Sequence, residues 1–145
     1  MSIPMLSPTL MVKDIEKSVK FYTQTLGFEE VGSLPGPDGK LVYASVRWKD
    51  VNIMFGSAAW LPANLRPYLG TGVDFYIIGT AEDDLDQYYQ ILRQQGVKID
   101  KEIQDQFWGD RTFSIKDPDG YQLTFAKTIK QVSPEEMMEA VKTMA

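Results

Sequence analysis

Asp74 is the acidic residue whose position most directly suggests chemistry. It lies between Val73 and Phe75 in the run VDFYII, which is expected to form a central strand. A carboxylate on such a strand costs free energy unless water, a partner or a ligand satisfies it. Asp74 is therefore a candidate for binding a cationic group or for acting as a base.

Aromatic side chains supply a second kind of candidate. Tyr43 and Tyr76 alternate with apolar residues on expected strands, and Trp108 follows Phe107 in an expected loop. An indole offers a large flat surface and one hydrogen-bond donor, and aromatic faces attract cations. Trp108 and Trp60 are equally compatible with a structural role, in which each indole fills a seam between modules or subunits.

The first half of the chain is expected to form a βαβββ unit. It opens with a strand at 9–12, followed by a helix that Asp14 caps and Gly27 ends. The apolar positions that recur at helical spacing in it are Ile15, Val19, Tyr22 and Leu26. Three more strands are expected at 28–33, 41–48 and 51–55. A two-residue turn at Lys49 and Asp50 joins the last two strands.

The second half repeats this order. A strand at 73–78 leads to a helix within 83–96, for which Thr80 and Asp83 form a candidate capping box. Its apolar positions repeat the spacing of the first helix at Leu85, Tyr89 and Leu92. Three strands follow within 97–103, 107–117 and 121–127, and the turn DPDG joins the last two into a hairpin.

Two such units predict an α+β fold. One βαβββ unit is a curled sheet with a helix on only one face, and two units placed edge to edge would give a cupped, eight-stranded half-barrel with a cavity on its concave side. We expect one domain over 1–145, with its parts at about 6–56 for module one, 57–72 for a linker, 73–128 for module two and 133–144 for a C-terminal helix. The apolar residues of that helix, which need a surface to cover, are Met137, Met138, Val141 and Met144.

Strand alternation divides the side chains into two sets. The set expected to line the cavity is Ser7, Thr9, Met11, Tyr43, Ser45, Arg47, Asn52, Met54, Asp74, Tyr76, Thr112, Ser114, Gln122 and Thr124. The opposite set is uniformly apolar and should pack beneath the helices, at Val42, Ala44, Val46, Val51, Ile53, Phe55, Leu123 and Phe125. Arg111 shares the parity of Phe113, and we expect it to pair with a carboxylate such as Asp117. The small polar residues of the first set also suit a solvated sheet face.

Composition excludes several classes of protein. The chain has no cysteine and no histidine, so disulfides, thiolate sites and imidazole ligands are absent. A net charge of -5 disfavours nucleic acid and anionic membranes as partners. The N-terminus MSIPMLSPTL lacks the features of a signal peptide, and no run has the roughly 20 apolar residues of a membrane span. A cytoplasmic protein is therefore expected.

Three segments in this order resemble the vicinal oxygen chelate superfamily, which includes glyoxalases, fosfomycin-resistance enzymes, extradiol dioxygenases and bleomycin-resistance proteins. They are LMVKDIEKSVKFYTQTLGFEEVG, GVDFYIIGTAEDDLDQYYQILRQQGV and FWGDRTFSIKDPDGYQLTF, and the match runs from about Pro8 to Lys127. Metal-dependent members carry their ligands on the first and last strand of each module. The corresponding positions here are Ser7, Met54, Asp74 and Thr124. Only Asp74 is suited to a metal, so the resemblance implies that the cavity is kept without a metal or other cofactor.

The lack of ligands and the sequence WGDR resemble the bleomycin-resistance branch, whose members are acidic, metal-free dimers that sequester a cationic glycopeptide antibiotic. The resemblance implies a metal-free homodimer that sequesters or carries a cationic or aromatic small molecule. The expected contacts are Ser7, Tyr43, Met54, Asp74, Tyr76, Trp108, Gln122 and Thr124.

Two alternatives stay open. The first is a lyase, isomerase or dioxygenase-type enzyme of the same fold. Such an enzyme would either be cofactorless, with Asp74 as base and Tyr76 or Tyr43 as donor, or use atypical metal ligands. The second is a structural or regulatory dimer whose cavity is vestigial.

Overall fold

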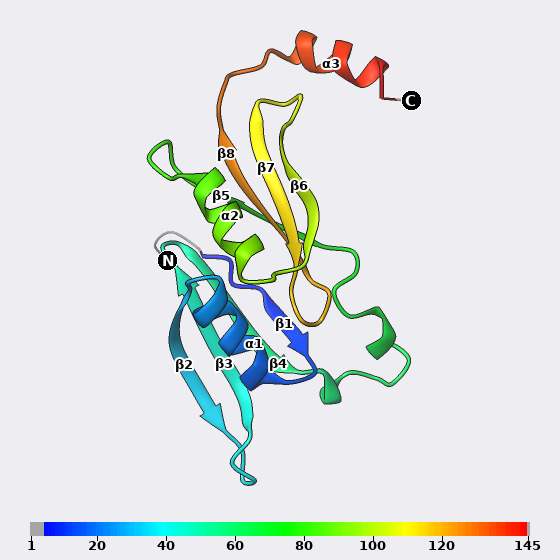
Figure 1. Cartoon of the computed structure of the whole chain (residues 1–145). Coiled ribbons are helices and arrows are strands. Elements are labelled where there is room, and N and C mark those ends of the chain that lie inside the picture. Colours follow the sequence, from blue (N-terminus) through cyan, green and yellow to red (C-terminus); the bar gives the residue numbers. More distant parts are fainter. Residues whose placement is uncertain (1–4, 145) are drawn as a thin grey trace. The chain divides into compact units, whose positions relative to one another are not determined.

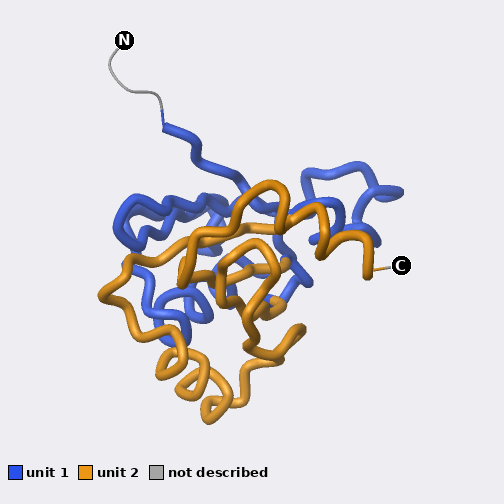
Figure 2. Tube along the Cα trace, turned by 90° about the horizontal axis from the view of Figure 1, so that it is seen from above, with its two compact units in different colours: residues 1–73, 117–121 blue, residues 74–116, 122–145 orange. Residues whose placement is uncertain are grey.

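The computed structural model describes residues 5–144 and contains two compact units, which Figure 2 colours separately. Unit 1 comprises the described residues up to Val73 together with Asp117–Tyr121, and unit 2 comprises Asp74–Lys116 and the described residues from Gln122 onward. Each unit contains one βαβββ module with a four-stranded mixed sheet that does not close into a barrel (Figure 1). The predicted α+β class and the paired modules are therefore confirmed.

The sheet of unit 1 has the strand order β1-β4-β3-β2, with β1 parallel to β4 and the other pairs antiparallel. Its elements are β1 (Thr9–Val12), α1 (Ile15–Lys20), the π-helical η1 (Phe21–Thr25), β2 (Glu29–Pro35), β3 (Leu41–Trp48) and β4 (Val51–Ser57). Asp14 caps α1 as predicted, because its Oδ1 accepts a 3.1 Å hydrogen bond from the amide of Lys17. The turn at Lys49 and Asp50 joins β3 to β4 as expected, and Lys49 has a φ of 53°.

The first helix departs from the single regular helix that its spacing predicts. After Lys20 it widens into η1, where the amide of Leu26 donates to the carbonyl of Phe21, five residues earlier. The Thr23 hydroxyl also donates to the carbonyl of Val19 at 2.7 Å, so a side chain joins the backbone ladder where the turn widens. Apolar spacing alone does not report such a change of helical pitch.

The core of unit 1 lies between its sheet and α1. Ala44, Val46, Ile53 and Phe55 are at most 1% exposed, as their parity predicts, whereas Val42 and Val51 of the same predicted set are only partly buried. The ring of Tyr22 is also buried, with its centroid 5.1 Å from that of Phe55.

Unit 2 has the corresponding strand order β5-β8-β7-β6. Its elements are β5 (Asp74–Ile78), α2 (Leu85–Gln94), β6 (Ile99–Asp105), β7 (Asp110–Lys116), β8 (Gln122–Thr128) and α3 (Pro134–Lys142). Leu85, Tyr89 and Leu92 are buried on the inner side of α2, as their spacing predicts. On the sheet, Leu123 and Phe125 are buried too.

The predicted capping box of α2 needs a correction. The helix begins at Leu85, and its N-cap is Asp84, which accepts from the amide of Gln87 at 3.0 Å. Asp83 instead accepts from the amide of Thr80 at 2.6 Å and stabilises the preceding turn. The predicted N-cap, Thr80, therefore lies in the turn before the helix, and Asp84 takes its place.

The linker after β4 contains two short 3-10 helices, η2 (Ala58–Trp60) and η3 (Arg66–Tyr68). It approaches the turn between β7 and β8 at Gly70, where a Cβ atom would lie 2.5 Å from the carbonyl carbon of Gly120. Gly70 also has a φ of +81°, so both its space and its backbone require glycine. Among the described residues, no helix is long and apolar enough to cross a membrane.

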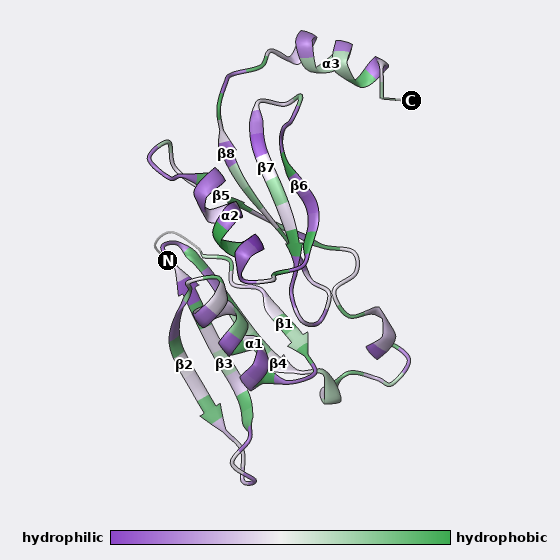
Figure 3. Cartoon of the chain, in the orientation of Figure 1, coloured by the Kyte–Doolittle hydropathy of each residue, from purple (hydrophilic) through white to green (hydrophobic). Residues whose placement is uncertain are grey.

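The predicted C-terminal helix is present as α3. Ser133 caps it by accepting from the amide of Glu136 at 3.1 Å, and Pro134 occupies the first turn. Apolar and polar residues alternate along it (Figure 3), yet none of its residues is buried. Met138, Val141 and Met144 are all more than half exposed.

Candidate functional site

One face of the unit 2 sheet carries polar residues that the strand register places side by side. Asp74 on β5 lies opposite Gln122 on β8, and Tyr76 lies opposite Thr124. Thr124 in turn lies opposite Ser114 on β7. Residues directly opposite each other point to the same face of a sheet, so these side chains form one surface, here called the polar face.

The carboxylate of Asp74 is held by two neighbours on β8. Its Oδ1 accepts a 2.7 Å hydrogen bond from the Thr124 hydroxyl and a 3.3 Å bond from the Gln122 amide. Among the described residues, no hydrogen bond reaches its Oδ2. One oxygen is therefore fixed in position while the other is available to a ligand.

The expected setting of Asp74 needs a correction. It was predicted on a central strand, but β5 is an outer strand of its four-stranded sheet, and Asp74 is exposed. Water therefore reaches this carboxylate, and it carries less desolvation cost than its apolar neighbours in the sequence suggest. Alternation showed which face Asp74 belongs to but not its place in the sheet.

Tyr76 lies at the centre of a second set of hydrogen bonds on the same face. Its hydroxyl donates to Asp110 Oδ2 at 2.5 Å and accepts from the Trp108 indole nitrogen at 2.9 Å. The other oxygen of Asp110 accepts from the Thr128 hydroxyl at 2.8 Å. Tyr76 and Trp108 are thus fixed by their polar atoms and still expose 38% and 37% of their surfaces.

Sequence reasoning did not select Asp110 as a site residue. It is only 9% exposed, and its carboxylate accepts hydrogen bonds from Tyr76 and Thr128. The sequence contained evidence for Asp110 as a site residue, because it has the same strand parity as Thr112 and Ser114 and lies within WGDR.

The environment of Tyr76 keeps its phenol neutral. Burial raises the pKa of Tyr76 to about 12, and the hydrogen bond to Asp110 contributes in the same direction. A group with this pKa transfers a proton poorly near neutral pH. The geometry therefore suits Tyr76 to hydrogen bonding and aromatic contact rather than to acid catalysis.

Three of the predicted contact residues lie in unit 1. Tyr43 is paired with Gly56, and Met54 with both Thr9 and Ser45, so Tyr43 and Met54 occupy the same face of their sheet. Ser7 precedes β1, and its hydroxyl accepts a 2.6 Å hydrogen bond from the Asn52 amide. A single cavity lined by both these residues and the polar face stays a prediction.

The residues at the family's ligand positions do not fit a transition metal. Thr124 donates to Asp74, and Ser7 is bonded to Asn52, while Met54 offers only a thioether. Within 5–144, no group of three or more His, Cys, Asp or Glu side chains is placed to hold a metal ion. One carboxylate with a thioether and two hydroxyls is not a donor set for Zn, Fe, Ni or Mn.

The predicted partner of Arg111 was wrong. Its guanidinium bonds to Asp86 on α2 at 2.8 Å and to Asp105 on β6 at 2.7 Å. Asp117 instead accepts a hydrogen bond from Tyr22. The parity of Arg111 directs it to the helix side of the sheet, where Asp86 lies, so parity was a better guide than nearness in sequence.

The fold and these residues define a protein of the glyoxalase type. The sequence model of the Glyoxalase/Bleomycin resistance protein/Dioxygenase superfamily matches residues 5–125. The chain belongs to this superfamily.

Individual relatives agree with this assignment. An uncharacterized protein of Mycobacterium bovis is 31% identical over 148 residues, which cover 97% of this chain and 93% of that protein. A bleomycin resistance protein of Geobacillus stearothermophilus is 30% identical over 132 residues, covering 85% and 96%. The crystal structure of TnmS3, an antibiotic binding protein of a Streptomyces species, has a TM-score of 0.67 with 24% identity, covering 88% and 98%.

Proposed function

We propose that this chain is a metal-free small-molecule-binding protein that sequesters or carries a cationic or aromatic compound, in the manner of an antibiotic-resistance protein. The observation that carries the proposal is the exposed Asp74 carboxylate, which is fixed through Oδ1 while no hydrogen bond within the described residues reaches Oδ2. A carboxylate held in this way is preorganised for a cation and loses little freedom on binding.

The aromatic pair beside Asp74 supports the same class of ligand. Tyr76 lies two residues along β5 from Asp74 on the same face, and Trp108 is bonded to the Tyr76 hydroxyl. A cation near a carboxylate and an aromatic ring gains both charge attraction and cation–π attraction. An anion would meet Asp74 and, behind Tyr76, Asp110.

The relatives support binding as the activity. The names of the bleomycin resistance protein and of the antibiotic binding protein TnmS3 both refer to an antibiotic. The superfamily's metal positions do not hold a suitable donor set in this chain, which favours retention of the ligand over its conversion. We further propose that the protein works as a cytoplasmic homodimer.

A thermal-shift comparison tests the proposal. Phenethylamine and benzyltrimethylammonium are the cationic probes, and phenylacetate and phenyl phosphate are the anionic ones. A ligand at 100 times its dissociation constant stabilises the native state by about 2.7 kcal/mol, which is readily seen as a rise in melting temperature. We expect the cations to raise the melting temperature and the anions to leave it unchanged.

Two variants test whether the preference for cations depends on Asp74. Asp74→Asn should abolish the response to the cations while the protein stays folded. Glu82→Gln removes one negative charge from the exposed loop before α2 and should respond like the parent. A stronger response to the anions, or an Asp74→Asn variant that binds cations as well as the parent, would overturn the proposal.

A further inference from the structure

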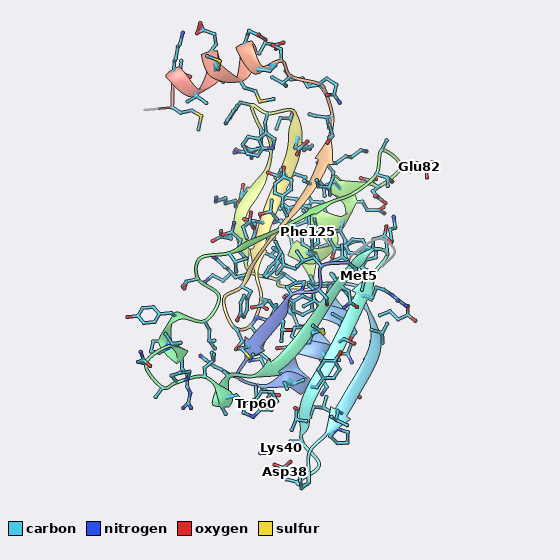
Figure 4. The ribbon with its side chains drawn as sticks, turned by 180° about the vertical axis from the view of Figure 1, so that it is seen from behind. Met5, Asp38, Lys40, Trp60, Glu82 and Phe125 are labelled. Carbon is cyan, nitrogen blue, oxygen red and sulfur yellow. The ribbon has the colours of Figure 1, made fainter. Side chains whose placement is uncertain are left out.

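Unit 1 contains a pocket with a volume of about 520 Å³. This volume lies within the range of about 300–1,000 Å³ that is usual for small-molecule sites. Its apolar lining includes Ile15, Leu41 and Val42, and Trp60 forms part of its wall. Figure 4 labels Trp60 together with two further lining residues, Asp38 and Lys40. None of these residues belongs to the polar face of unit 2.

Trp60 is 62% exposed, and its backbone is held in place. Its backbone is fixed by η2, which Ser57 caps by accepting from the amide of Ala59 at 3.1 Å. Arg66 strengthens the segment by donating to the carbonyls of Ala59 at 3.0 Å and Leu61 at 3.2 Å. A tryptophan on such a support offers a flat contact surface at a low cost in ordering.

The indole of Trp60 lies next to Gly56 in β4. A Cβ atom at Gly56 would lie 3.6 Å from Cζ3 of Trp60 and 3.1 Å from the sulfur of Met11. The distance to Trp60 is an ordinary van der Waals contact, so the indole packs against β4 at Gly56.

Acidic side chains at the rim of the pocket are also fixed. One oxygen of Glu16 accepts from the amide of Leu41 at 2.7 Å, and one oxygen of Asp38 accepts from the amide of Lys40 at 3.0 Å. Among the described residues, no hydrogen bond reaches the second oxygen of either carboxylate. With Asp14, which also lines the pocket and accepts from the amide of Lys17, three carboxylates of the lining can face an ammonium group.

Positive groups line the same pocket. Lys13 and Lys40 both contribute to the lining, and within the described part of the chain neither ammonium group has an ion pair or hydrogen bond. Acidic residues and lysines therefore line the same pocket without forming ion pairs with each other. Charges of both signs stay available beside an aromatic wall.

We infer that this pocket is a second binding site and that it takes a small aromatic zwitterion, of the chemical class of an aromatic amino acid. The ring of the ligand lies against Trp60, its ammonium group faces Asp38 and Glu16, and its carboxylate faces Lys13 and Lys40. A purely cationic or purely anionic aromatic compound satisfies only one of these sets and meets charges of its own sign in the other. A zwitterion without a ring lacks the contact with Trp60.

Four probes separate these contributions when binding is followed by NMR through the indole N–H signal of Trp60. L-Phenylalanine carries the ring and both charges, phenethylamine lacks the carboxylate, 3-phenylpropanoate lacks the ammonium group, and L-alanine lacks the ring. We expect saturable shifts with L-phenylalanine and at least tenfold weaker binding of the other three. Equal binding of any one of those three would overturn the assignment of a zwitterion.

Calorimetry on variants locates the site. Trp60→Ala and Lys40→Gln should each weaken binding of L-phenylalanine at least several-fold, and Trp60→Phe should retain part of it. Tyr68→Ala, which removes a 65% exposed aromatic residue of the same linker outside the pocket, should bind like the parent. Equal losses in Tyr68→Ala and Trp60→Ala, or unchanged binding in Trp60→Ala, would exclude this pocket.

One further variant separates this site from the proposed function. Asp74→Asn should bind L-phenylalanine as the parent does, because Asp74 does not line the pocket. Loss of L-phenylalanine binding in Asp74→Asn would place the ligand at the polar face and overturn the second site. Loss of cation binding alone in that variant supports both assignments.

Discussion

The hydroxyl of Tyr22 donates a 2.8 Å hydrogen bond to Oδ2 of the buried Asp117, although 95 positions separate these residues in the sequence. The other oxygen of Asp117 accepts from the amides of Asp119 and Tyr121, each at 2.9 Å. Burial raises the pKa of the Asp117 carboxyl above its usual value, and these hydrogen bonds act against that rise. Asp117 thereby connects the DPDG turn to the helical segment of unit 1.

Tyr22→Phe should lower the free energy of unfolding by about 1–3 kcal/mol, because it leaves the buried Asp117 oxygen without its donor. Denaturant unfolding followed by circular dichroism measures the change. Tyr68→Phe removes a hydroxyl from a residue that is 65% exposed and should stay within about 0.5 kcal/mol of the parent. Equal stabilities of the two variants would show that the Tyr22 hydrogen bond does not contribute.

Stability should decrease at alkaline pH. The folded state raises the pKa of Tyr76 to about 12, mainly through burial, and also raises the pKa values of Tyr22, Tyr88 and Tyr121 by burial. An unfolded tyrosine has a pKa of about 10, so above that pH the unfolded state binds fewer protons than the native state. The contribution of these tyrosines to the free energy of unfolding should therefore be fully present below about pH 10. It should be lost between about pH 10 and 12.

Unfolding measurements from pH 8 to 11 test this alkaline decrease, and absorbance at the phenolate band reports ionisation. Tyr76→Phe should remove one phenol with a raised pKa, so the free energy of unfolding should fall less steeply with rising pH. A stability that stays constant above pH 10 would contradict raised tyrosine pKa values in the folded state.

The purified protein should contain no stoichiometric transition metal. The reason is the donor set, because the four family positions offer one carboxylate, one thioether and two hydroxyls. Elemental analysis after purification without chelator measures the content, and addition of a chelator should leave the melting temperature unchanged. One tightly held Zn, Ni, Fe or Mn per chain would disprove this prediction and support an enzymatic function.

The C-terminal helix should contribute to self-association more than to folding of the single chain. None of the residues of α3 is buried, and Met138 and Val141 expose 65% and 54% of their surfaces. Exposed apolar side chains on one helix commonly mark an interface. We expect a dimer by light scattering, and Met138→Gln with Val141→Gln should weaken it.

Glu139→Gln is the matched control on the same helix and should leave the association constant of the dimer unchanged. Deletion of 133–145 should have little effect on the unfolding free energy of the monomer. A monomeric parent at micromolar concentration, or equal weakening by Glu139→Gln, would contradict a role for the apolar residues of α3.

The fold was largely predictable from local patterns. Alternation in LVYASVRW and VNIMF separated the buried Ala44, Val46, Ile53 and Phe55 from the polar side, and helical spacing identified Leu85, Tyr89 and Leu92 as the inner side of α2. Local patterns were less informative where several neighbours offered the same interaction. Thr80 and Asp84 both suit an N-cap, and the structure uses Asp84.

The candidate site was predicted only in part. Parity placed Asp74, Tyr76, Gln122 and Thr124 on one face, but it did not show that Thr124 and Gln122 both bond to the same oxygen of Asp74. Asp110 shares this parity but was not selected, and only the structure showed that it accepts a hydrogen bond from Tyr76. The partner of Arg111 was misassigned because sequence separation does not report distances in space.

The sequence by itself determined the two modules, the apolar and polar sides of their strands and the residue types at the four positions that correspond to the family's metal ligands. These properties depend on backbone periodicity and on the chemistry of each side chain, both of which are local. Only the tertiary structure decided that Asp110 supports Tyr76, that Tyr22 reaches Asp117 and that Trp60 lies over Gly56 beside a pocket. Each of these relationships is a distance between atoms on different elements, and such distances are set by how the elements pack, which local periodicity does not encode.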